Sequence, residues 1–157
     1  MSWTYAKLAR EYATLWDSMQ ITRDLSVIDR QLDRIMDHRA AYEAVSQATG
    51  VPWFVIGIFD LREGGGGART HLHNGDPLRA RTVQVAINRP PMGKGPFTFF
   101  ESACDALRLK KLDKVTEWSV ERIAFTFEQY NGFGYRDHRN MLSPYLWGGT
   151  NHQQPGK

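Results

Sequence analysis

The sequence predicts a single α+β domain that is mostly helical and carries a small β-hairpin. Its 157 residues suit one hydrophobic core. Apolar residues recur at helical spacing along most of the chain. Between positions 68 and 88 that spacing gives way to turn residues and a two-residue alternation, which is typical of a hairpin.

The first part of the chain is expected to form three helices. Apolar stripes predict helices over residues 2–19 and 25–48. Gly50 is suited to end the second helix, because glycine tolerates the left-handed conformation common at helix ends. Pro52 fits the first position of a third helix over Trp53–Arg62. That helix is apolar nearly all round, so we expect it in the core.

The predicted hairpin follows Glu63. The run Gly64–Gly67 cannot hold a helix, and Asn74-Gly75 is a strong signal for a tight hairpin turn. Beyond the turn, residues 82–87 alternate between apolar and polar or small side chains, as a strand does.

Two further helices are expected before an irregular tail. Thr98 and Glu101 form a capping-box pattern that opens a helix ending near Leu112. Ser119–Tyr130 is the last clear helix, and the remainder of the chain is rich in aromatic residues and glycine. The single domain over 1–157 thus comprises helices (1–48), core and hairpin (51–88), and helices with the aromatic tail (97–157).

Composition excludes several classes of protein. With 41% hydrophobic and 24% charged residues, the chain is not a disordered tail. Its one cysteine, Cys104, cannot form a disulfide within the chain. No apolar run reaches membrane-spanning length, and the first twenty residues lack the apolar region of a signal peptide. We therefore expect synthesis in the cytoplasm, a monomer, and no stable membrane insertion.

Positive charge gathers in one stretch. Between Arg62 and Lys94 there are six basic residues and only two acidic ones, Glu63 and Asp76. Such a surface attracts anionic polymers, among them nucleic acid and bacterial cell wall.

Glu63 is the first candidate for catalysis. It ends the most hydrophobic helix, where partial burial and the negative end of the helix dipole both raise the pKa of a carboxyl. A carboxyl that stays protonated near neutral pH can act as a general acid. The alternative is a glutamate that simply leaves the helix into solvent.

Asp76 and Thr82 extend this candidate site. Asp76, at the expected hairpin turn, can face the end of the helix across a cleft, and two carboxyls in different environments are the groups that cleave a glycosidic bond. Thr82 could hold a water beside it. Taken singly, aspartate is an ordinary turn residue and threonine an ordinary strand residue.

A metal site is the rival interpretation. His71 and His73 lie two apart, which places them on one face of a strand, and with Asp76 they would form a zinc set for metal-assisted hydrolysis. No fourth ligand is evident, so we expect no metal and no cofactor. The histidines are then expected to orient the hairpin or to line the cleft together with Asn74.

The aromatic tail supplies further candidates for binding a sugar. Sugar rings stack on aromatic faces, and an asparagine amide can bridge hydroxyl or N-acetyl groups. The candidates are four aromatic residues and one asparagine: Tyr130, Tyr135, Tyr145, Trp147 and Asn131. We expect Tyr135 and Trp147 to be partly exposed.

Several of these segments together resemble small phage and prophage endolysins of the lysozyme superfamily. The most specific block is Thr70–Leu78, followed by Arg81-Thr82. The supporting segments are Gly50–Trp53, Gly95–Thr98, Glu101–Ala103, Tyr130–Tyr135, Ser143–Trp147 and Thr150–His152. The resemblance covers the chain from about residue 40 onward.

The resemblance implies a lysozyme-like fold and cleavage of the β-1,4 bond between N-acetylmuramic acid and N-acetylglucosamine. The family's essential glutamate matches Glu63, and its aspartate and threonine match Asp76 and Thr82. The implied partner is bacterial peptidoglycan rather than nucleic acid. Such an enzyme acts in the periplasm, where a holin-type release would let it cause cell lysis.

Two departures from the family's pattern keep alternatives open. Relatives carry serine or alanine after the glutamate rather than four glycines, and often histidine in place of Asp60. A lytic transglycosylase that uses the same acid is one alternative, and a wall-binding module that has lost catalysis is another. The metal hydrolase built on His71, His73 and Asp76 is the third.

Overall fold

The computed structural model describes residues 2–155, and the contacts within the chain divide it into two compact units. Unit 1 combines the chain up to Leu25 with the chain from Glu117 onward, and unit 2 is Ser26–Thr116. The expectation of one domain over residues 1–157 stays a prediction.

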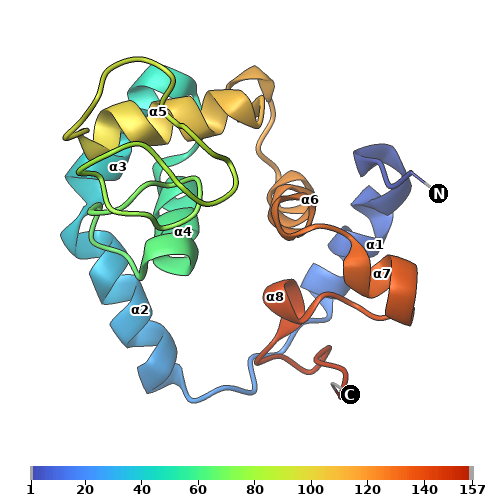
Figure 1. Cartoon of the computed structure of the whole chain (residues 1–157). Coiled ribbons are helices and arrows are strands. Elements are labelled where there is room, and N and C mark those ends of the chain that lie inside the picture. The colour runs from blue at the N-terminus through green and yellow to red at the C-terminus, as the bar shows by residue number, and fades with distance from the viewer. Residues whose placement is uncertain (1, 156–157) are drawn as a thin grey trace. The chain divides into compact units, whose positions relative to one another are not determined.

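Unit 2 is built from four helices and one short 3-10 helix (Figure 1). They are α2 (Leu25–Asp37), α3 (Arg39–Thr49), α4 (Trp53–Gly64), α5 (Phe99–Leu109) and η1 (Leu112–Lys114). The predicted helix over 25–48 is two helices, α2 and α3, because the chain breaks at His38, where φ is −114°. Gly50 ends α3 in the left-handed conformation, as expected.

Helix α4 supplies the centre of the unit 2 core. Val55, Ile56 and Phe59 are buried, which confirms the prediction for this helix. A Cβ on Gly57 would lie 2.6 Å from the Ile35 side chain and 3.2 Å from the Tyr42 ring, so α4 approaches α2 and α3 closely there. The predicted capping box also forms: the Thr98 hydroxyl accepts from Glu101 N–H, and the Glu101 carboxylate accepts from Thr98 N–H.

Unit 1 packs four helices around a second core. These are α1 (Tyr5–Asp17), α6 (Val120–Asn131), α7 (Gly134–Arg139) and α8 (Pro144–Trp147). The tail expected to be irregular therefore holds α7 and α8. The core of this unit consists of Leu8, Tyr12, Ala124, Phe125 and Trp147.

A buried polar cluster joins α1, α6 and α7 of unit 1. The Tyr12 hydroxyl donates to Glu128 at 2.6 Å, and Arg136 donates to the same carboxylate through Nε at 2.7 Å and Nη2 at 3.0 Å. Glu128 is fully buried, so these donors replace the water that its charge would otherwise require.

The predicted β-hairpin is wrong, and with it the α+β fold class. Residues 2–155 contain no β-strand, only two isolated bridges, Ile21–Thr150 and Thr70–Pro77. Pro77 has no N–H with which to continue a ladder. The N–H groups of Val83 and Gln84, which a strand would use for pairing, donate to the Asp76 carboxylate instead. The chain is mostly helical, and a long irregular loop replaces the hairpin.

Across the described residues, no single helix combines the length and apolar composition that a membrane span requires, although the pair α3 and α4, bent by 118°, passes that test together.

Candidate active site

Glu63 lies in the last turn of α4 and is half-buried. Partial burial raises the pKa of its carboxyl above the ordinary value, and the nearby cations Arg62 and Lys110 oppose this shift without reversing it. The negative end of the α4 dipole acts in the same direction as burial. The carboxyl therefore holds its proton to higher pH than a solvated glutamate does.

The glycine run after Glu63 forms the C-terminal cap of α4. Gly65, Gly66 and Gly67 all have φ between 77° and 99°, a region that other residues rarely adopt. Gly66 N–H bonds back to the Asp60 carbonyl at 3.1 Å. The buried Asp60 carboxylate accepts from Ala68 N–H and from the Tyr42 hydroxyl, each at 2.8 Å. These bonds hold the segment in a defined conformation.

The segment Thr70–Pro77 lies directly against the end of α4. A Cβ on Gly75, where φ is 84°, would be 2.2 Å from the Glu63 carbonyl oxygen. A Cβ on Gly64 would be 1.9 Å from the Thr70 hydroxyl oxygen. The approach at Gly75 is possible only for glycine, because its neighbour is a backbone atom and its φ is positive. Gly75 is thus the contact that brings the chain around Asp76 to the helix turn that carries Glu63.

Asp76 is 6% exposed, and its carboxylate organises the loop that follows. Its Oδ2 accepts from Val83 N–H, Gln84 N–H and Asn74 Nδ2, at 2.8, 3.1 and 3.1 Å. Its Oδ1 accepts from Gln84 Nε2 at 2.9 Å. Burial alone would raise the pKa of Asp76, but these donors outweigh it and hold the pKa below the ordinary value.

Thr82 closes the base of the same loop rather than facing Asp76 with its hydroxyl. The hydroxyl donates to the Ala86 carbonyl and accepts from Arg89 N–H. Thr82 N–H donates to the Arg89 carbonyl at 2.9 Å. Because the hydroxyl hydrogen is already used within the loop, the expected role of Thr82 in holding a water does not match its placement.

His71 and His73 are held inside the unit by partners on α5 and in the loop. His71 is fully buried, its Nε2 donates to the Ala80 carbonyl at 2.8 Å, and its Nδ1 lies 2.7 Å from the Ser102 hydroxyl. The Nε2 of His73 lies 2.7 Å from Asp105. Burial lowers the pKa of His73, while Asp105 opposes that shift.

The histidine network continues to Arg89, whose Nε and Nη2 donate to the two carboxylate oxygens of Asp105 at 2.9 and 2.5 Å. Through these contacts His71 and His73, before the loop of residues 77–88, and Arg89, after it, all bind α5. The expected hairpin is absent, so the two histidines instead hold the irregular loop against α5. Since His71 and the His73 side chain are buried, neither is placed to contact a sugar.

The proposed metal set does not assemble. The nitrogens of His71 face Ser102 and a carbonyl, His73 faces Asp105, and the Asp76 carboxylate faces the loop donors. Among residues 2–155, no three His, Cys, Asp or Glu side chains form a group that could hold a metal ion.

An open groove of about 560 Å³ lies between α2 and the end of α4. Its walls include Arg30, Gln31 and Arg34 of α2, together with Leu61 and Gly65. Glu63 follows Leu61 by two residues, which is about 200° around a helix. The Glu63 side chain therefore lies on the face of α4 opposite Leu61, and the cations that act on its carboxyl are Arg62 and Lys110.

The five aromatic and amide candidates of the tail all belong to unit 1. Trp147 is 3% exposed and forms part of the core, so the expectation of its partial exposure is wrong. Tyr135 is partly exposed, as expected, and its ring centroid lies 5.9 Å from that of the exposed Tyr145. Tyr130 is half-buried and precedes Asn131 at the end of α6. Asn131 Nδ2 donates to the Phe127 carbonyl at 2.7 Å.

No family model matches the sequence, and the searches of curated proteins and of solved structures give no match either.

Sequence reasoning missed the residues that support the site. Gln84 binds Asp76 with both its backbone and its side chain, while Ser102 and Asp105 hold the two histidines. The three-residue spacing of Ser102 and Asp105 puts them on one face of the predicted helix. Paired with two histidines two residues apart, that spacing was a usable signal. Nothing in the sequence marks Gln84.

Proposed function

We propose that the chain is a peptidoglycan-cleaving glycosidase in which Glu63 is the general acid. The observation that carries the proposal is the close backbone contact between Gly75 and the Glu63 carbonyl, which joins the two segments that carry Glu63 and Asp76. The Glu63 carboxyl has its pKa raised by burial and the Asp76 carboxyl has its pKa held low by hydrogen bonds. Glycosidases use two carboxyls whose pKa values differ in this way, one protonated and one ionised.

In this mechanism Glu63 donates its proton to the glycosidic oxygen as the bond from C1 to that oxygen breaks. The leaving sugar departs as an alcohol, and positive charge develops at C1 of the other sugar. A water molecule then adds to C1 while the Glu63 carboxylate takes one of its protons, which completes the hydrolysis and restores the acid. Asp76, ionised at neutral pH, contributes a fixed negative charge on the neighbouring segment. The substrate proposed from the family resemblance is the β-1,4 bond between N-acetylmuramic acid and N-acetylglucosamine.

A second candidate, a lytic transglycosylase, is favoured by the surroundings of Asp76. Four N–H donors on one buried carboxylate make it a weak nucleophile and a weak base. A transglycosylase needs neither role from a second carboxylate. The 6-hydroxyl of the muramic acid attacks C1, and the Glu63 carboxylate takes the hydroxyl proton, which restores the acid and leaves a 1,6-anhydro product.

The test is digestion of purified peptidoglycan sacculi, with the released fragments analysed by mass spectrometry. Either enzyme releases disaccharide-peptide fragments, and the hydrolysed product is heavier than the anhydro product by one water. Full activity in excess EDTA would exclude the metal hydrolase. Binding to sacculi without fragment release would reject catalysis and identify a wall-binding module.

A further inference from the structure

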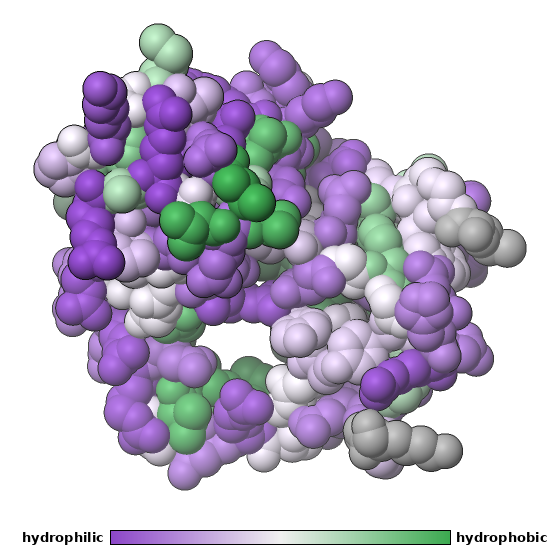
Figure 2. Space-filling model, viewed as in Figure 1, coloured by the Kyte–Doolittle hydropathy of each residue, from purple (hydrophilic) through white to green (hydrophobic). Residues whose placement is uncertain are grey.

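The loop between Thr82 and Arg89, here called the apolar loop, exposes aliphatic side chains to solvent. Val83, Val85 and Ile87 are 77%, 83% and 59% exposed, and the nearby Met92 is 81% exposed. In Figure 2, hydrophobic side chains gather over the loop region of unit 2 and are bordered by hydrophilic ones. Four large apolar side chains this exposed within ten residues mark an interaction surface.

Hydrogen bonds to backbone groups of the apolar loop hold it in place. Asp76 accepts from Val83 and Gln84 N–H, and Asn74 Nδ2 donates to the Val85 carbonyl at 3.4 Å. Thr82 and Arg89 close the base through hydrogen bonds in both directions. The exposed side chains are therefore presented by an organised loop, and binding through them costs less conformational entropy than ordering a free segment.

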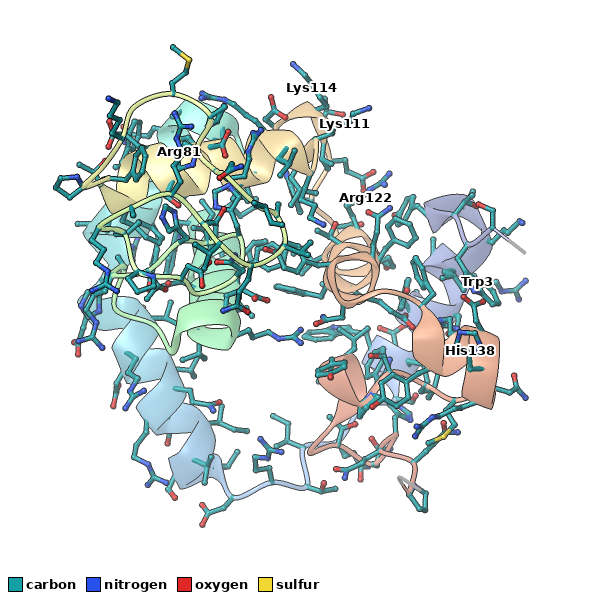
Figure 3. All side chains as sticks on the ribbon, in the orientation of Figure 1. Trp3, Arg81, Lys111, Lys114, Arg122 and His138 are labelled. Carbon is teal, nitrogen blue, oxygen red and sulfur yellow. The ribbon has the colours of Figure 1, made fainter. Side chains whose placement is uncertain are left out.

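The flanks of the apolar loop are cationic. From residue 77 to residue 100 the chain has four basic residues and no acidic one. Arg89 is paired with Asp105, while Arg81, labelled in Figure 3, donates only to the carbonyls of Pro91 and Gly93 and so keeps its net charge. The other two, Arg79 and Lys94, are exposed.

We propose that the apolar loop binds peripherally to the surface of an anionic phospholipid bilayer. Projecting aliphatic side chains suit a fluid apolar layer, which yields to their shape, and the surrounding cations match phosphate headgroups. Each cation near such a surface adds favourable electrostatic energy that salt screens. The proposal is independent of whether Glu63 catalyses a reaction, since it requires no contact with peptidoglycan.

The test is co-sedimentation of the full chain with vesicles of phosphatidylethanolamine and phosphatidylglycerol, with phosphatidylcholine vesicles for comparison. We expect binding to the anionic vesicles that weakens with salt. The triple variant Val83→Ser, Val85→Ser, Ile87→Ser should lower the partition coefficient at least ~10-fold, because it removes apolar area that would enter the bilayer. Leu109→Ser, which removes a partly exposed apolar side chain at the end of α5, should leave it unchanged.

The triple variant should unfold at the same urea concentration as the parent, because the replaced side chains are exposed. Failure of the parent to bind anionic vesicles would overturn the proposal. Equal binding by the triple variant would do so too. Loop-dependent binding to sacculi but not to vesicles would also overturn it, since the loop would then contact the wall.

Discussion

The contact between Gly75 and the end of α4 can be tested by adding one methyl group. Gly75→Ala places a Cβ 2.2 Å from the Glu63 carbonyl oxygen and 3.1 Å from the Glu63 carbonyl carbon. Both are backbone atoms of a helix, so no flexible side chain can move aside. At a φ of 84° the alanine is also strained in its own backbone. The variant therefore carries two separate costs.

The two costs can be separated with Gly50→Ala. Gly50 also has a positive φ, 76°, but a Cβ there meets nothing within 4 Å. It therefore pays only the left-handed backbone strain, about 1 kcal/mol. Gly75→Ala has the same strain and, in addition, a destabilisation of about 1–3 kcal/mol from overpacking against the helix end. We expect free energies of unfolding lower by about 1 kcal/mol for Gly50→Ala and about 2–4 kcal/mol for Gly75→Ala.

The assay is urea unfolding followed by far-ultraviolet circular dichroism, with the slope m compared among the three proteins. A shift of the midpoint at constant m reports a change in stability alone. If the two variants are destabilised equally, within about 0.5 kcal/mol, segment 70–77 does not contact α4 and the account of the site is refuted.

Three further predictions concern hydrogen bonding and pH. Asp76→Asn should lower the free energy of unfolding by roughly 2–3 kcal/mol at pH 7, because the amide cannot accept all four hydrogen bonds. The stabilisation by the Asp76 carboxylate is present above its ordinary pKa of 3.8 and is lost as pH falls through the lowered pKa of the folded state. The urea midpoints of the parent and the variant should therefore converge in acid. Glu63→Gln should match or exceed the parent in thermal stability at neutral pH and lose that advantage below about pH 4.5, since a raised pKa lowers stability as pH rises. Ser102→Ala should cost about 1–3 kcal/mol by leaving His71 Nδ1 unsatisfied, whereas Ser143→Ala, at a buried hydroxyl with no partner, should be close to neutral in the same urea titration. Equal effects of the two serine variants would argue against the His71–Ser102 bond.

Local signals in the sequence predicted the helices well. The apolar core of α4, the left-handed Gly50 and the capping box of Thr98 and Glu101 depend on neighbours within a few residues, and the structure has all of them. The break at His38 gave no signal. Ile35 and Tyr42 are seven residues apart, which continues the helical stripe across the break, and no glycine or proline lies there.

The failed predictions depended on long-range contacts. The alternation around Val83 and Val85 suggested a strand, but both side chains are exposed and the backbone donors of the segment turn to Asp76. Trp147, flanked by glycine in the sequence, is buried because α8 packs in the unit 1 core. The segments that carry Glu63 and Asp76 are in backbone contact through Gly75, while the pairing of the two carboxyls stays a prediction. The partners that hold Asp76 could not be inferred from spacing.

The proposed role of Glu63 as the acid of a peptidoglycan glycosidase is tested by the rate at which Glu63→Gln releases fragments from purified sacculi. Glu117→Gln, at an exposed glutamate of unit 1, is the matched control. With all three proteins folded alike by circular dichroism, we expect the parent and Glu117→Gln to release fragments at the same rate. Glu63→Gln should be slower by about 10²-fold or more. Equal release by Glu63→Gln and the parent would contradict the account.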